Sequence, residues 1–170
     1  MGLLLAIVSL AITQGMTSEN KTELPPEVLE LISGYSEQVK RGAKVYDLVC
    51  SNCHGNTGLG IEEGKAEFLP EHQRCEQCHR RNNAARLIDV EISERNSFNI
   101  GTPPALHDLA KFGTAAGLKA YIEAAMPRYE PGTLSAEDYL DITAFLLALN
   151  KKLPEDITLT AETLTTILLE

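Results

Sequence analysis

CSNCH at residues 50–54 and CEQCH at residues 75–79 share the pattern C-x-x-C-H, which indicates covalent attachment of c-type haem. Two thiols separated by two residues reach the two vinyl groups on one edge of a porphyrin and form thioethers. The histidine that follows is held beneath the iron and supplies its proximal nitrogen ligand. The pentapeptides therefore predict two haems c, with thioethers from Cys50, Cys53, Cys75 and Cys78 and iron ligands from His54 and His79.

All four cysteines of the chain belong to these two pentapeptides, so none remains for a structural disulfide. Two C-x-x-C pairs about twenty residues apart also describe a four-cysteine zinc site. A zinc site does not require a histidine after each pair, yet both pairs have one. Two haems are therefore the favoured interpretation, and a single haem or a zinc site are the alternatives.

The composition favours a small haem domain over a nucleic-acid-binding protein. The chain has 170 residues, no tryptophan and a formal net charge of −9. This length fits one domain with extensions, and a buried porphyrin would supply the large apolar surface that the scarce aromatic residues do not. Phosphate contacts need a basic patch, so the acidic balance argues against nucleic acid. It favours basic redox partner proteins, although solubility explains the charge equally well.

The N-terminus carries an apolar run over residues 2–13, with no lysine or arginine before it. The run has the length of a signal-peptide core and is too short to span a bilayer alone. We expect residues 1–15 to be a signal peptide with a misplaced start, or a membrane anchor packed against other subunits; a buried helix is a third interpretation. Either of the first two places the protein in the periplasm or elsewhere outside the cytoplasm.

Three helices are predicted within residues 36–150. The first leads into the first pentapeptide and presents one apolar face at helical spacing, formed by Val39, Gly42, Ala43, Tyr46 and Cys50. The second begins at Thr114, a plausible N-cap, and stops at Met126-Pro127 because proline ends a helix. Its expected inner face comprises Leu118, Tyr121, Ile122 and Ala125.

The third helix begins with a sequence like a capping box at residues 135–138 and ends before Pro154. Its expected inner face comprises Tyr139, Ile142, Leu146 and Leu149. Residues 16–35 are expected to form a linker and a short helix. Residues 151–170 form a C-terminal tail that docks either on the domain or on a partner.

With these residues assembled, residues 36–150 resemble a class I cytochrome c domain. The resemblance implies an all-α fold around covalent haem, in which Gly42 and Tyr46 of the first helix pack on Ile142 and Phe145 of the last. It also implies roles at the haem site. The turn at Pro104 and Leu106 would border the haem of the first pentapeptide, here called haem 1. The Pro104 carbonyl would accept a hydrogen bond from the His54 ring. Met126 would be the sixth ligand of the haem 1 iron.

The chain departs from this family between His54 and Pro104, where it is several times longer than a minimal domain. An insertion at about residues 60–100 carries the second pentapeptide. Two tandem domains are excluded, since the first would lack room for its methionine loop and closing helix. Haem 2 is therefore expected on the insertion, close to haem 1. His107 is the tentative sixth ligand of haem 2 and His72 the runner-up; a methionine, a partner's residue and an open site are further alternatives.

The predicted function is electron transfer by an exported dihaem c-type cytochrome that is not an enzyme. Its partners would be redox proteins, among them a membrane respiratory or photosynthetic complex. An alternative is a small haem oxidoreductase of the peroxidase or sulfur-compound type, with an open haem 2. Another alternative is a subunit of a membrane complex, anchored by residues 2–13.

Overall fold

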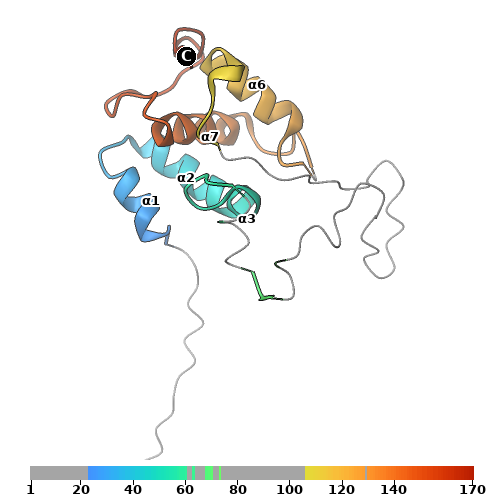
Figure 1. The fold of residues 1–170 in the computed structure, drawn as a ribbon. Coiled ribbons are helices and arrows are strands. Elements are labelled where there is room, and N and C mark those ends of the chain that lie inside the picture. Colours follow the sequence, from blue (N-terminus) through green and yellow to red (C-terminus); the bar gives the residue numbers. More distant parts are fainter. Residues whose placement is uncertain (1–22, 61–62, 64–67, 71–72, 74–105, 129) are drawn as a thin grey trace, which may run out of the picture.

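The computed structural model describes residues 23–60, 63, 68–70, 73, 106–128 and 130–170. This part of the chain is helical and contains no β-strand, which confirms the predicted all-α fold (Figure 1). None of its helices is both long and apolar enough to cross a membrane. The α-helices are α1 (Pro26–Leu31), α2 (Glu37–Val49), α3 (Ser51–His54), α6 (Ala115–Ala125) and α7 (Ala136–Leu149), and the 3-10 helices are η4 (Ala110–Phe112) and η5 (Thr163–Thr165).

Helix α7 forms the centre of the domain and lies between α2 and α6 (Figure 1). It begins with the predicted capping box, in which the Ser135 hydroxyl accepts from the Asp138 amide and the Asp138 side chain accepts from the Ser135 amide. The predicted inner face is buried, but so is every residue from Asp141 to Leu149. The last nine residues of α7 are therefore buried on every face of the helix, which is more than the predicted single face.

Helices α2 and α7 meet through Gly42. A Cβ atom at this position would lie 1.9 Å from the Asp141 carbonyl oxygen and 3.0 Å from the Ile142 nitrogen. One turn later the rings of Tyr46 and Phe145 pack with their centroids 5.0 Å apart. The predicted contact between the first and last helices is thus confirmed.

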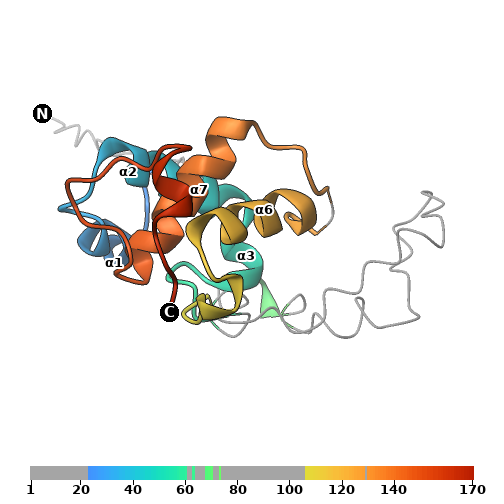
Figure 2. The same ribbon diagram turned by 90° about the horizontal axis from the view of Figure 1, so that it is seen from above.

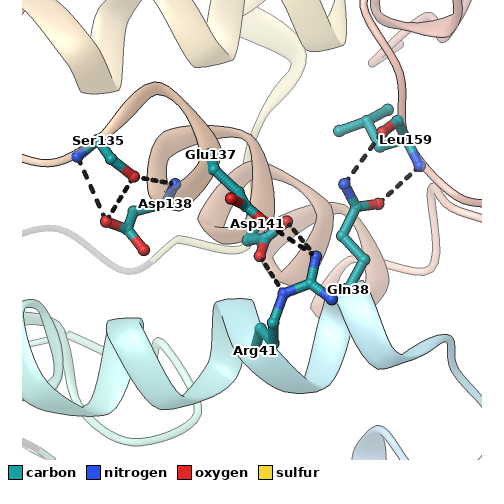
Figure 3. A network of polar contacts seen from close by, with 7 residues as sticks. All are labelled: Gln38, Arg41, Ser135, Glu137, Asp138, Asp141 and Leu159. Carbon is teal, nitrogen blue, oxygen red and sulfur yellow. Dashed lines mark hydrogen bonds and ion pairs between the residues drawn. The ribbon is translucent and has the colours of Figure 1, made fainter.

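A charged pair sits beside this crossing (Figure 3). Arg41 of α2 donates from Nε and Nη2 to the two carboxylate oxygens of Asp141, at 2.7 and 3.2 Å. The Asp141 side chain is only 3% exposed, and Glu137 lies 3.7 Å from the same guanidinium. This bidentate pairing satisfies the hydrogen-bonding capacity and the charge of the buried Asp141 carboxylate. An unpaired carboxylate there would oppose the close approach of the two helices.

Helix α6 begins and ends where the sequence predicts. The Thr114 hydroxyl caps it by accepting from the Gly117 amide at 3.1 Å, and Met126 is its C-cap. Leu118 and Ile122 point into the core. Tyr121 does not, so this part of the predicted inner face is wrong: the side chain is 44% exposed and its ring packs on Phe112 of η4, with centroids 5.0 Å apart.

The C-terminal tail, residues 151–170, packs on the domain. This is one of the two placements that the sequence left open. Gln38 of α2 exchanges two hydrogen bonds with the main chain of Leu159, at 3.0 and 2.7 Å (Figure 3). Further along, the Ala115 amide donates to Ile167 and the Leu169 amide donates to Gly113. The tail therefore contacts both α2 and the start of α6, and Figure 2 shows the C-terminus beside the latter.

Candidate haem site

The first pentapeptide folds as one tight turn between α2 and a glycine loop. Cys50 ends α2, and its carbonyl accepts from the amides of Cys53 and His54, both at 3.0 Å. Residues three apart on a helix share a face, so the two thiols lie along one side of the turn. His54 is the last residue of α3 and is buried. Two thiols and an imidazole in one turn are the donor set that covalent haem attachment requires.

The Cys50 thiol is largely shielded from solvent in this turn. Burial raises the pKa of Cys50 to about 12, and the neighbouring Cys53 adds to the shift. The sulfur therefore keeps its proton at neutral pH. Thioether formation adds the sulfur and hydrogen of a thiol across a vinyl double bond, and Cys50 and Cys53 each supply one such thiol. The described residues of the first pentapeptide thus fit haem c.

The loop that follows His54 is held by a carboxylate. Glu63 accepts hydrogen bonds from the Thr57 amide, the Thr57 hydroxyl and the Leu59 amide, at 3.0, 2.8 and 3.1 Å. Gly55 makes room for it, since a Cβ there would lie 2.0 Å from Glu63 Oε2, and its φ of +81° also favours glycine. Sequence reasoning missed Glu63, because one acidic residue in a charged stretch gives no signal of its own.

Tyr46 of α2 also holds the chain at the end of α3. Its hydroxyl is buried and donates to the Gly55 carbonyl at 2.8 Å. Burial raises the pKa of Tyr46 well above its ordinary value of 10.0, and Cys50 adds to the effect. The residue that packs on Phe145 therefore also holds the main chain next to His54.

Leu106 and His107 close the same loop. The Leu106 amide donates to the Gly58 carbonyl at 2.7 Å, and its own carbonyl accepts from Asn150, the C-cap of α7, at 2.9 Å. His107 Nε2 lies 2.9 Å from the Thr57 carbonyl oxygen. Because a carbonyl only accepts, Nε2 donates this bond. The structure thus places Leu106 beside the His54 loop, and it directs His107 toward the same loop.

Met126 lies at the junction of α6 and the following loop. It is partly buried and packs against the core. Its amide donates to the Ile122 carbonyl at 2.8 Å, and its carbonyl accepts from the hydroxyl of Tyr139 in α7 at 3.0 Å. Ligation of haem 1 by Met126 stays a prediction.

Several predicted site residues lie outside the described part of the chain. They are His72, Cys75, Cys78, His79 and Pro104. The expected signal peptide or anchor at residues 1–15 and most of the expected insertion at about residues 60–100 also lie outside it. The predictions for the second haem and for the Pro104 carbonyl therefore stay predictions.

One comparison with known proteins, that with family models, agrees with the first pentapeptide and the helical fold. The cytochrome c family model matches residues 39–150, which is more than half of the chain. Comparison with curated proteins gives no match. Among solved structures, the sulfane dehydrogenase SoxCD from Paracoccus pantotrophus is similar with 23% sequence identity and a TM-score of 0.44, over 77% of this chain and 52% of that one. This chain thus spans about half the length of that one. On the family match, the chain belongs to the cytochrome c family, whose members bind haem c covalently and transfer electrons through it.

Proposed function

We propose that this protein is an exported, non-enzymatic electron carrier that holds two haems c, one on each C-x-x-C-H pentapeptide. The observation that carries the proposal is the turn at residues 50–54, where two thiols and a buried imidazole come together at the end of α2. The same five-residue pattern occurs again at residues 75–79. Bound haem c supplies reversible one-electron chemistry between ferric and ferrous iron.

At haem 1, the chain would hold the cofactor from both sides. Cys50 and Cys53 form the tethers, His54 is the proximal ligand and Met126 the sixth. A carrier that is rigid around its iron needs little rearrangement when the charge changes. The bonds of Tyr46 and Glu63 to the loop after His54 supply that rigidity on the proximal side. Ligation of the iron by the sulfur of Met126 raises the reduction potential of haem 1 relative to ligation by two histidines.

At haem 2, Cys75 and Cys78 would be the tethers and His79 the proximal ligand. We keep His107 ahead of His72 as the sixth ligand, because its side chain is exposed and follows the insertion closely in sequence. Ligation through Nε2 requires its bond to the Thr57 carbonyl to open. That bond is worth about 1 kcal/mol net, so an iron–imidazole bond outweighs it.

The partners proposed for this carrier are basic redox proteins, including a membrane respiratory or photosynthetic complex. The support is the net charge of −9, which haem propionates make more negative. Residues 1–15 would serve as export signal or anchor. Such encounters are fast and weaken as salt rises.

Covalent haem per polypeptide tests the proposal, measured by intact mass together with an alkaline pyridine spectrum. We expect two haems in the natural sequence, and one in a variant with Cys75→Ser and Cys78→Ser. One haem in the natural sequence overturns the dihaem assignment. Bound zinc without haem overturns the proposal as a whole. Binding of carbon monoxide or peroxide to haem 2 would favour the alternative of a small haem oxidoreductase with an open haem 2.

Met126→Leu tests the sixth ligand of haem 1, because leucine keeps the size of the side chain and removes its sulfur. The expected result is loss of the charge-transfer band that methionine-ligated ferric haem shows at the red end of the spectrum. The midpoint potential of haem 1 should shift with it. An unchanged band would assign that ligand to another residue. His107→Ala gives the parallel test at haem 2, where the low-spin spectrum should be lost.

A further inference from the structure

The main chain of Met126 is bound to two different helices. Its amide donates to Ile122 within α6, and its carbonyl accepts from Tyr139 of α7 at 3.0 Å. The residue therefore has both polar main-chain groups satisfied at the point where the chain leaves α6. The Cα atom from which its thioether extends is fixed relative to α7 by one hydroxyl.

Tyr139 is well placed to serve as an anchor. Its side chain is 1% exposed, so the ring has no room to turn away. It lies one turn into α7, just after the Ser135–Asp138 capping box. Its own carbonyl accepts from the Thr143 hydroxyl at 2.7 Å. A buried tyrosine on a capped helix presents its hydroxyl at one position only.

The loop after Met126 adds no comparable anchor among the residues described. Its hydrogen bonds there are internal: the Glu130 amide donates to the Pro127 carbonyl, and the Thr133 hydroxyl donates to the Glu130 carbonyl. Neither bond joins the loop to α7 or α2. Without the Tyr139 hydroxyl, the position of Met126 would depend on the end of α6 and on side-chain packing.

We infer that Tyr139 is the positioning residue that holds Met126 in reach of the haem 1 iron, through its hydrogen bond to the Met126 carbonyl. This inference rests on the proposed role of Met126 as sixth ligand. A methionine–iron bond is weak and competes with external ligands. The Tyr139 hydroxyl therefore sets how often the sixth position opens, without touching the iron or the sulfur.

Tyr139→Phe is the direct test, since phenylalanine keeps the ring in the core and removes only the hydroxyl. The measurement is the association rate of carbon monoxide with ferrous haem 1, which requires Met126 to leave. To isolate haem 1, the experiment uses the variant in which Cys75 and Cys78 are replaced by serine. We expect carbon monoxide to bind up to about tenfold faster, the factor that follows from losing one hydrogen bond. The ferric charge-transfer band should weaken in parallel.

Two controls separate positioning from general stability. Tyr35→Phe also removes a phenol hydroxyl bound to an α7 carbonyl, that of Ala148 at 3.4 Å. Gln38→Ala removes two buried hydrogen bonds to Leu159 and lowers overall stability more. Both should keep the natural carbon monoxide rate. Faster binding in Gln38→Ala equal to that in Tyr139→Phe would overturn the inference, as would an unchanged rate in Tyr139→Phe.

The two proposals fail in different ways. If Met126→Leu leaves the charge-transfer band and the carbon monoxide rate unchanged, Met126 is not the ligand and the proposed function fails at this residue. If Met126→Leu changes both while Tyr139→Phe changes neither, the ligand stands and only the positioning role of Tyr139 fails.

Discussion

At the scale of single residues, the hydroxyl of Tyr46 links the core of the domain to the haem turn. It is buried and donates to the Gly55 carbonyl, the first carbonyl after His54. Burial raises its pKa above the ordinary 10.0, so the fold requires the neutral phenol. The unfolded chain has no such requirement, and the difference makes stability depend on pH.

The sign of this dependence follows from the raised pKa. Below the ordinary value of 10.0, Tyr46 is neutral in both states and its contribution is fully present. Above that value the unfolded chain ionises while the folded chain does not, so the free energy of unfolding falls by about 1.4 kcal/mol per pH unit. Urea unfolding at several pH values on either side of 10.0 measures this slope.

Lysines and other tyrosines titrate in the same range, so Tyr46→Phe is needed as the reference. The variant should be less stable at neutral pH because it loses the bond to Gly55, and its stability should fall less steeply at alkaline pH. Equal slopes in the two proteins would show that Tyr46 ionises as easily in the folded state as in the unfolded one.

At the scale of elements, the approach of α2 to α7 depends on the missing side chain of Gly42. A methyl group there would lie 1.9 Å from the Asp141 carbonyl oxygen, which belongs to a helix backbone and cannot move aside. Gly42→Ala should therefore force the helices apart and reduce the free energy of unfolding by about 2–3 kcal/mol. The midpoint of urea unfolding reports the loss.

Gly34→Ala is the matched control for this substitution. A Cβ at Gly34 would meet Glu155, with its carboxylate oxygen 2.7 Å away. That group is the far end of a flexible side chain and can rotate away. We expect stability within about 0.5 kcal/mol of the natural protein. A loss in Gly34→Ala as large as that in Gly42→Ala would contradict the role assigned to the helix crossing.

The elements were predictable from sequence because their signals are local. Thr114 and Ser135 cap their helices by accepting hydrogen bonds from the amides three positions later in the chain. Pro127 ends α6 because proline has no amide hydrogen and its ring clashes with the preceding turn. The burial of α7 on all sides was not predictable. The core that encloses it includes Leu159 and Leu169, which come from a tail that the sequence placed on either the domain or a partner.

The candidate haem site also has one part that the local sequence predicts and another that depends on residues far apart in the chain. The pentapeptide and Met126 can be read from their own residue types and neighbours. The bonds that hold them join residues far apart in sequence: Asn150 to Leu106 across 44 positions and His107 to Thr57 across 50. Such pairs have no spacing rule, so only the folded structure brings them together.

At the scale of the whole molecule, the tail is part of the fold although it lies beyond the family match at residues 39–150. Leu168 and Leu169 are neighbours with opposite environments, 60% and 1% exposed. Leu169→Ala should lower the free energy of unfolding by about 2–4 kcal/mol, because it opens a cavity beside the start of α6. Thermal unfolding followed by circular dichroism measures this loss.

Leu168→Ala makes the same chemical change at the adjacent, exposed position. It should change stability by no more than about 0.5 kcal/mol. Equal losses in the two variants would contradict the role assigned to the burial of Leu169. No loss in either would mean that the tail is dispensable to the domain.

The distance along the chain between Arg41 and Asp141 has a consequence for how the protein reaches its fold. The two residues are 100 positions apart, so their meeting closes a long loop, at an entropy cost that rises with the logarithm of its length. A link from His54 through iron to Met126 would bypass most of that loop and leave about thirty residues to close, which lowers the cost by about 1 kcal/mol. In the proposed arrangement, ligation of the iron by Met126 during folding would therefore lower the entropy cost of bringing α7 to α2.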